Sequence, residues 1–94
     1  MNGKLAKTAN GFYSYEIFEA EENYMFTLAD MLTKHFDFQI TNAPFVGLDG
    51  VYLDVIESGV KLTVGWDIWS GAFVSAHCST GNEYIKKIAD CCEN

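Results

Sequence analysis

Two stretches in the second half of the chain alternate apolar and polar residues, which is the pattern of strands that bury one face. They cover Val51–Glu57 and Val60–Asp67, and only Ser58-Gly59 separates them, the length of a tight β-hairpin turn. This turn places residue 57 opposite residue 60 and so sets the register of both strands. On this register the apolar residues pair on one face: Val55 with Leu62, Leu53 with Val64, and Val51 with Trp66.

A third strand is predicted over Ala72–Cys78. If Trp66 pairs with Ala72, the aliphatic residues of this stretch fall on the same apolar face as those of the hairpin. The connection over residues 67–71 has the length of a short hairpin loop, and Gly71 can adopt a positive φ there. The pattern therefore predicts an antiparallel meander of three strands with one apolar face.

The first half of the chain predicts a strand, a helix and a short strand, in that order. Phe12–Phe18 is rich in the aromatic residues that favour strands. Between Ala20 and Phe36, apolar residues recur at helical spacing, and nearby glutamates suit the positive end of a helix dipole. Phe38 and Ile40 then alternate with polar residues, which is typical of a short strand.

Two further segments are rich in turn-forming residues. Residues 1–11 are polar, contain two Gly and two Asn, and are expected to form a flexible lead-in. Residues 42–50 contain the only proline of the chain and predict an irregular loop. We expect the apolar residues of this loop to pack against the body of the protein; they are Phe45, Val46 and Leu48.

The C-terminal segment predicts a second amphipathic helix. Thr80 and Glu83 have the spacing of a capping box, which indicates a helix start. Two amphipathic helices and one apolar sheet face can bury each other in a two-layer α+β sandwich. We therefore predict a single domain over residues 1–94, with an antiparallel sheet of four or five strands and both helices on one face.

The charge balance narrows the class of partner. Thirteen Asp and Glu oppose six Lys, the chain contains no Arg, and the net charge is -7. Arg is the usual residue for bidentate phosphate contacts, which dominate nucleic-acid affinity, so direct binding of nucleic acid or of an anionic membrane is not expected. An acidic surface instead attracts basic proteins. We find no apolar run that could span a bilayer and no secretory signal, so we expect a cytoplasmic protein with reduced cysteines.

No motif in the chain indicates catalysis or metal binding. Asp54, Ser75 and His77 fall on one predicted sheet face, but no nucleophile elbow or glycine-rich turn accompanies them. The three cysteines, Cys78, Cys91 and Cys92, lack the CxxC spacing of common zinc sites. We therefore expect no catalytic residue, no metal ligand and no cofactor, and a protein that is not an enzyme.

The face of the meander opposite the helices is expected to be open. It combines carboxylates with aromatic side chains, the residues that anchor protein interfaces. Alternatively, another segment of the chain or a second copy covers this face, and Tyr52 and Phe73 only shield Gly65. Trp69 lies at a hairpin tip, either as an exposed anchor or as a lid folded over the hairpin. The predicted partner-binding residues are Asp49, Tyr52, Asp54, Glu57, Asp67, Trp69 and Phe73.

The most distinctive segment is Gly65-Trp66-Asp67-Ile68-Trp69-Ser70-Gly71. A small acidic α+β body with this Trp-Asp-x-Trp-Ser-Gly hairpin resembles the small immunity proteins of bacterial toxin systems, including those of contact-dependent growth inhibition. The resemblance lies in size, charge, layout and this one loop. It implies a cytoplasmic inhibitor that binds one cognate toxin domain, often a nuclease with a basic active-site cleft, and blocks it by covering that cleft.

Two other functions fit the same surface. A phage or mobile-element inhibitor that mimics the charge of nucleic acid would carry a similar acidic face. A homodimeric structural domain would use the face against a second copy of the chain. We expect a monomer or a weak homodimer, and sedimentation at micromolar concentration separates the cases because an obligate dimer remains dimeric on dilution.

Overall fold

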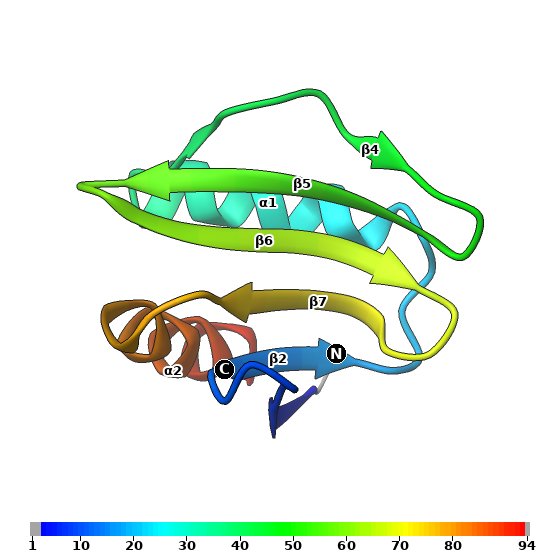
Figure 1. Ribbon diagram of the computed structural model, residues 1–94, viewed down its shortest axis with the longest axis horizontal. Helices are drawn as coiled ribbons and strands as arrows, with labels where there is room; N and C mark the ends of the chain where they lie inside the picture. Colours follow the sequence, from blue (N-terminus) through cyan, green and yellow to red (C-terminus); the bar gives the residue numbers. More distant parts are fainter. Residues whose placement is uncertain (1–2, 94) are drawn as a thin grey trace.

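The computed structural model describes residues 3–93, which fold into two layers, an antiparallel sheet and a pair of helices (Figure 1). The sheet order is β1-β2-β7-β6-β5-β3, and β4 also pairs with β5. No helix of the described residues has the length and apolar character needed to cross a membrane. The elements are β1 (Lys4–Lys7), β2 (Tyr13–Ile17), α1 (Tyr24–His35), β3 (Gln39–Ile40), β4 (Phe45–Val46), β5 (Gly50–Glu57), β6 (Val60–Asp67), β7 (Gly71–Ala76) and α2 (Ser79–Glu93).

The strands β5, β6 and β7 form the predicted meander in the predicted register. Every apolar pair expected in the hairpin is observed, and Trp66 lies opposite Ala72. Ser58 and Gly59 both adopt positive φ, 49° and 81°. Two successive residues of this kind are what a two-residue turn needs to match the twist of its strands. The local turn chemistry and the apolar pattern thus agree on one register.

The hydrophobic core lies between the two layers and confirms the α+β sandwich with both helices on one face of the sheet. The helices contribute five side chains that are almost completely buried: Met25, Leu28, Leu32, Ile85 and Ile88. They pack against the face of the sheet that carries the predicted apolar residues, from Tyr15 in β2 to Leu53 in β5. Trp66 belongs to this face as expected, and its indole Nε1–H donates to the Ala20 carbonyl at 2.9 Å.

The sheet has more strands than expected, because the N-terminal segment pairs with it. Leu5 lies opposite Tyr15, and the Gly3 N–H donates to the Tyr15 hydroxyl oxygen at 2.8 Å. The Thr8 N–H then donates to the Phe12 carbonyl and closes the turn into β2. The expected flexible lead-in is therefore wrong for residues 3–11, while residues 1–2 lie outside the described residues. A polar strand of four residues carries little local signal, and pairing with β2 defines it.

The predicted loop over residues 42–50 contains β4, and its apolar side chains are exposed. Phe45 and Val46 pair with β5 at the edge of the sheet, and Leu48 follows in the turn to β5. All three side chains are exposed, so the expectation that they pack against the body is wrong. The physical reason is that pairing holds this segment at the sheet edge, where Phe45 faces the side without helices and α1 does not cover Val46.

Both helices begin at different residues from those predicted. Two turns precede α1: the Ala20 N–H donates to the Ile17 carbonyl at 3.1 Å, and the Tyr24 N–H donates to the Glu21 carbonyl at 3.0 Å. The helix α1 ends with Lys34 and His35 in its last turn, as expected for cations at that end of the dipole. In α2, the Cys78 Sγ accepts the Gly81 N–H at 3.4 Å and caps the helix. The capping box predicted from Thr80 is therefore wrong, because the helix starts one residue earlier, at Ser79.

Candidate protein-binding surface

The face of the sheet opposite the helices carries a row of aromatic side chains near one end. Phe45 of β4 pairs with Tyr52 of β5. Tyr52 in turn pairs with Gly65 of β6, and Gly65 pairs with Phe73 of β7. The rings of Tyr52 and Phe73 lie 6.0 Å apart between centroids. No helix among residues 3–93 packs on this side of the sheet, so no helix covers these aromatic side chains.

The glycine in this row makes room for its aromatic neighbours. A Cβ atom on Gly65 would lie 2.8 Å from the Phe73 ring and 2.9 Å from the Tyr52 ring. The two rings therefore occupy the space that a side chain at this position would need, and they shield the strand from water. Phe73 is only 8% exposed as a result. The packing interpretation of this pair is correct, and Phe73 offers little surface to a partner.

A polar row crosses the same face next to the aromatic row. The Asp54 Oδ1 lies 2.8 Å from the Thr63 Oγ1, which lies 2.7 Å from the His77 Nε2. An ionised carboxylate only accepts hydrogen bonds, so the Thr63 hydroxyl donates to Asp54 and must accept from an Nε2–H of His77. The Thr63 proton therefore points at the Asp54 carboxylate, and His77 is the donor to the Thr63 oxygen.

The structure does not bring together the serine, histidine and aspartate that the sequence places on this face. The Ser75 Oγ donates to the Ser14 Oγ at 3.1 Å, and Thr63 takes the place between Asp54 and His77. A nucleophilic serine needs a base within hydrogen-bond reach and a donor pair for the oxyanion. The hydrogen bonds of Thr63 and Ser75 instead connect neighbouring strands, and the bond from Thr63 holds Asp54 in place at the sheet surface.

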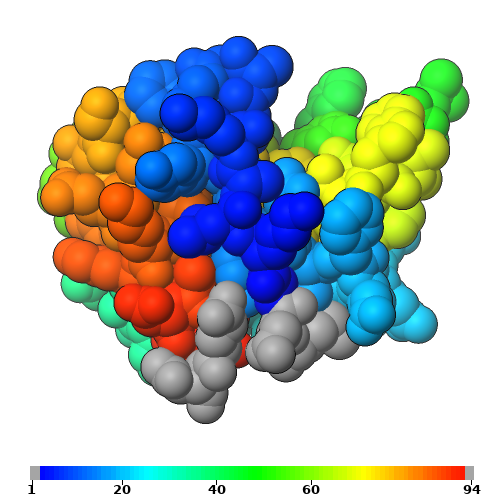
Figure 2. Space-filling model, turned by 90° about the horizontal axis from the view of Figure 1, so that it is seen from below, coloured from blue at the N-terminus to red at the C-terminus, as the bar shows by residue number. Residues whose placement is uncertain are grey.

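Two loops meet at one end of the sheet and project from it together. The Ile68 N–H, in the β6–β7 loop, donates to the Asp49 carbonyl, in the β4–β5 loop, at 3.1 Å. Figure 1 and Figure 2 both show the green β4–β5 segment and the yellow β6–β7 loop projecting at the same end of the molecule. We call this region the distal end; its exposed residues are Phe45, Leu48, Asp49, Ile68 and Trp69.

Asp67 shapes the loop that carries the exposed tryptophan. Its Oδ1 accepts the backbone N–H groups of Trp69, at 3.0 Å, and of Ser70, at 2.6 Å. Aspartate at the start of a turn commonly satisfies the next backbone donors in this way. Trp69 itself is 63% exposed. The lid interpretation is therefore wrong, and Trp69 stands out from the body as an anchor would.

The predicted binding residues divide into three groups in the structure. Asp49 and Trp69 lie on the distal end, and Asp67 lies directly beneath it, engaged by the loop backbone. Tyr52 and Asp54 are half-buried on the open sheet face, next to the buried Phe73. Five of these six residues retain solvent access, and Phe73 is the buried one.

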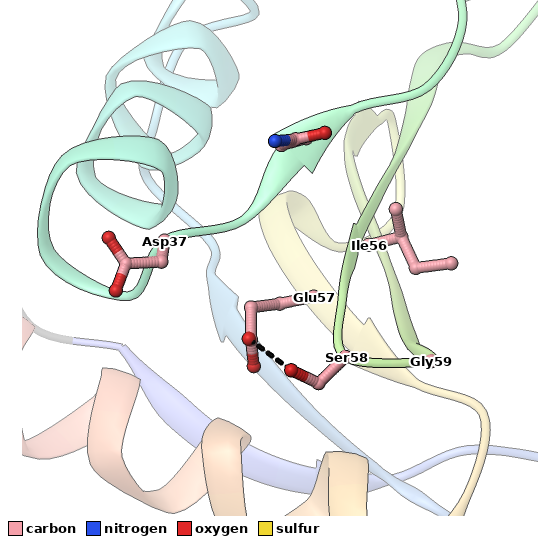
Figure 3. A pocket seen from close by; sticks show the side chains of 6 residues that line it. Asp37, Ile56, Glu57, Ser58 and Gly59 are labelled. Atoms are coloured by element: carbon pink, nitrogen blue, oxygen red, sulfur yellow. Dashed lines mark hydrogen bonds between the residues drawn. The ribbon is translucent and has the colours of Figure 1, made fainter.

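Glu57, the seventh predicted residue, lies apart from this region. It follows the core-facing residues of β5 on the helix side, where its carboxylate accepts the Tyr84 hydroxyl of α2 at 2.7 Å. Hydrogen bonds from Ser58 and Tyr84 lower the pKa of Glu57. Figure 3 shows this carboxylate hydrogen-bonded to Ser58. Glu57 and Asp37 both line a small polar pocket of about 270 Å³ at the β5–β6 turn. The structure therefore places Glu57 apart from the other predicted residues, because the last residue of the strand points to the helix layer.

Sequence reasoning missed three apolar residues of the distal end. Phe45, Leu48 and Ile68 were assigned to loops without a binding role, although all are exposed in the structure. A signal was present, because the turn-rich stretch over residues 42–50 holds apolar residues with no periodicity that would bury them. A contiguous patch of exposed apolar residues with polar residues at its rim is typical of an interaction site.

The acidic groups around the distal end influence one another. Burial and the nearby charge of Asp67 raise the pKa of Glu16 above its ordinary value of 4.5, and Lys4 partly offsets this effect. Burial, with Asp67 and then Asp49, also raises the pKa of Tyr52. Burial is the larger cause of both shifts, and the carboxylates of Asp67 and Asp49 add to it. Carboxylates gathered on one side of a molecule favour a cationic partner surface.

We expect Glu16→Gln to stabilise the fold at neutral pH by a few tenths of a kcal/mol. A carboxyl whose pKa is higher in the folded state binds its proton more tightly there, so stability is lost as pH rises from the unfolded pKa through the folded pKa. The gain from Glu16→Gln should therefore be present at pH 7 and absent near pH 3, well below either value (about 4 when unfolded). Thermal unfolding across this pH range measures it. A constant difference at all pH values would contradict the assignment.

Comparison with protein families, with curated proteins and with solved structures found no match to this chain. The functional proposal therefore rests on the residues of the surface described above.

Proposed function

We propose that this protein is an acidic protein-binding inhibitor of immunity type, which neutralises a cognate toxin by covering its basic active-site region. The observation that carries the proposal is the distal end, where two loops joined by a backbone hydrogen bond present Trp69, Ile68 and Leu48 to solvent. Exposed Trp among apolar neighbours is the composition of an interface hot spot.

The charge of the chain supports a basic partner. A net charge of -7 without any Arg gives a field that attracts cationic surfaces and speeds their association. Asp49 on the distal end, and Asp54 on the open face, are placed to meet Lys or Arg side chains of the partner. A toxin that acts on nucleic acid needs such cationic residues in its active-site cleft, because it must bind phosphates. Covering them would block the substrate sterically and electrostatically.

We expect Asp49→Lys to slow association with the cognate toxin domain, which is to be sought among the products of adjacent genes, by roughly tenfold at low salt. The side chain of Asp49 is exposed, and its backbone carbonyl makes the bond to Ile68, so the substitution reverses the charge and leaves this bond in place. The association rate can be measured by stopped-flow mixing with the purified toxin domain at several salt concentrations.

Asp90→Lys is the matched control, because Asp90 is exposed on α2 and the change in net charge is the same. It should slow association much less than Asp49→Lys. Equal effects of the two variants would show that net charge acts without a defined site. Failure of the wild-type protein to bind the toxin domain or inhibit its activity would overturn the proposed function itself.

A homodimer is the second candidate, because the same exposed apolar residues could meet those of another copy. The chain would then sediment as a dimer at micromolar concentration and remain one on dilution. The charge argues against it, since two copies would bring Asp49 and its neighbours against like charges.

A further inference from the structure

An apolar groove lies on the helix side of the molecule, next to the distal end. It is formed between the start of α1 and β4, which Figure 1 places at the same end of the molecule, and it has a volume of about 460 Å³. We call it the α1–β4 groove. Its lining residues are Glu22, Asn23, Phe26, Pro44, Val46 and Val51.

The groove exists because β4 stands at the edge of the sheet while α1 packs nearer its centre. Val46 pairs with the buried Val51, so its side chain lies on the helix side of the sheet. The first turn of α1 leaves Phe26 facing outward, 49% exposed, while Met25 beside it in sequence enters the core. Aromatic and aliphatic groups therefore line a depression that no other described segment fills.

The charge around the groove selects the kind of partner that can enter it. Glu22 contributes to the lining itself, and the exposed Glu19 and Glu21 precede it in the turn before α1. No Lys or His lines the groove. An apolar depression with carboxylates at its rim matches an apolar group flanked by cations, and it disfavours an acidic partner.

We propose that the α1–β4 groove binds a cationic amphipathic helix of the partner protein. Its apolar face would contact Phe26 and Val46, and Lys or Arg at its border would contact Glu22. The volume exceeds what one side chain fills, and a helix offers two or three neighbouring apolar side chains from positions i, i+3 and i+4. This inference rests on the proposed function in that the partner is the same basic protein, and it adds a second contact beyond the distal end.

The test uses a model peptide and the full chain. A 15-residue helix-forming peptide of Leu and Lys, with the leucines on one face, is titrated into the ¹⁵N-labelled protein at about 150 mM salt, where long-range attraction is screened. We expect saturable binding with the largest amide shifts at Phe26 and Val46. A peptide with Ser in place of Leu, and one with Glu in place of Lys, should each bind at least about tenfold more weakly.

Two pairs of variants separate the groove from general attraction by charge. Glu22→Lys should weaken binding of the Leu-Lys peptide about tenfold, whereas Glu21→Lys, adjacent and also exposed, should weaken it only slightly. Phe26→Ser should weaken it about tenfold, whereas Leu5→Ser, equally exposed (46%) but on β1, should not. All four positions are exposed enough for the fold to tolerate the change, which circular dichroism verifies.

Equal losses in Glu21→Lys and Glu22→Lys, unchanged binding of the Ser-containing peptide, or no binding at all would each overturn this inference. None of these results affects the proposed function, which depends on binding of the toxin domain through the distal end. Conversely, specific binding of the Leu-Lys peptide together with no response to any toxin domain would retain the groove and remove the immunity function.

Discussion

On the proposed function, replacing Trp69 by Ala is expected to weaken binding of the toxin domain by roughly 30-fold or more, about 2 kcal/mol. Trp69 is the largest exposed side chain of the distal end, and it stands on a loop whose backbone is held by Asp67 and by Asp49. A tryptophan on a fixed loop loses little conformational entropy when it enters a pocket of the partner. The free energy gained from contacts of the ring with the partner would therefore be reduced only slightly by the loss of conformational entropy on binding.

Calorimetric titration of the purified toxin domain with wild-type and variant proteins measures this loss. Ile40→Ala provides the control, because Ile40 is also a large exposed apolar residue but lies on β3, where it pairs with Val55 away from the distal end. The melting temperature should be almost unchanged by Trp69→Ala, since the side chain is exposed. If both variants bind as tightly as wild type, the distal end is not the contact surface.

Replacing Gly71 by Ala is expected to destabilise the fold by about 3 to 5 kcal/mol, a large share of the total stability of a small domain. Gly71 has φ 72°, which side chains disfavour by about 1–2 kcal/mol. A Cβ atom there would also lie 2.2 Å from the Ile17 carbonyl oxygen, so β2 and β7 would have to separate. Urea unfolding followed by circular dichroism measures the difference in free energy.

Gly59→Ala separates the two causes of this loss. Gly59 has a similar φ of 81°, but a Cβ atom there meets nothing within 4 Å. It should therefore cost only the conformational term, about 1–2 kcal/mol. Equal losses in the two variants would show that backbone crowding between β2 and β7 does not matter. The close approach of Gly71 to β2 also bears on the proposed binding surface, because Gly71 ends the loop that carries Trp69.

The meander was predictable because several local rules agree on it. Apolar alternation, the Ser58-Gly59 turn and the short loop before Gly71 each require the same register, and a shift by one residue would expose the apolar face. The presence of α1 was predictable for a similar reason, because its apolar stripe has a single period, although the helix begins at Tyr24 and not near Ala20 as predicted. Consistent local signals of this kind leave few alternatives for the tertiary structure to choose between.

The edges of the sheet were not predictable from these rules. β1 and β4 are short, and the pairing that defines each comes from a strand that lies elsewhere in the sequence. Whether Phe45 or Leu48 is buried depends on whether the helix layer reaches the edge of the sheet, which no local pattern reports. Hydrophobicity alone favoured burial for both, and the position at the edge decided otherwise.

The candidate surface divides in the same way. The sequence alone determines the acidic charge, the absence of Arg and the tryptophan at a hairpin tip. It also predicts the two-layer α+β arrangement, in which one face of the sheet has no helix. Only the folded chain decided that Glu57 turns toward α2, that Phe73 is covered by Tyr52, and that two distant loops meet through Ile68 and Asp49. The physical reason is range: periodicity and turn chemistry act between near neighbours, whereas a surface is made by segments that contact one another only after the core has formed.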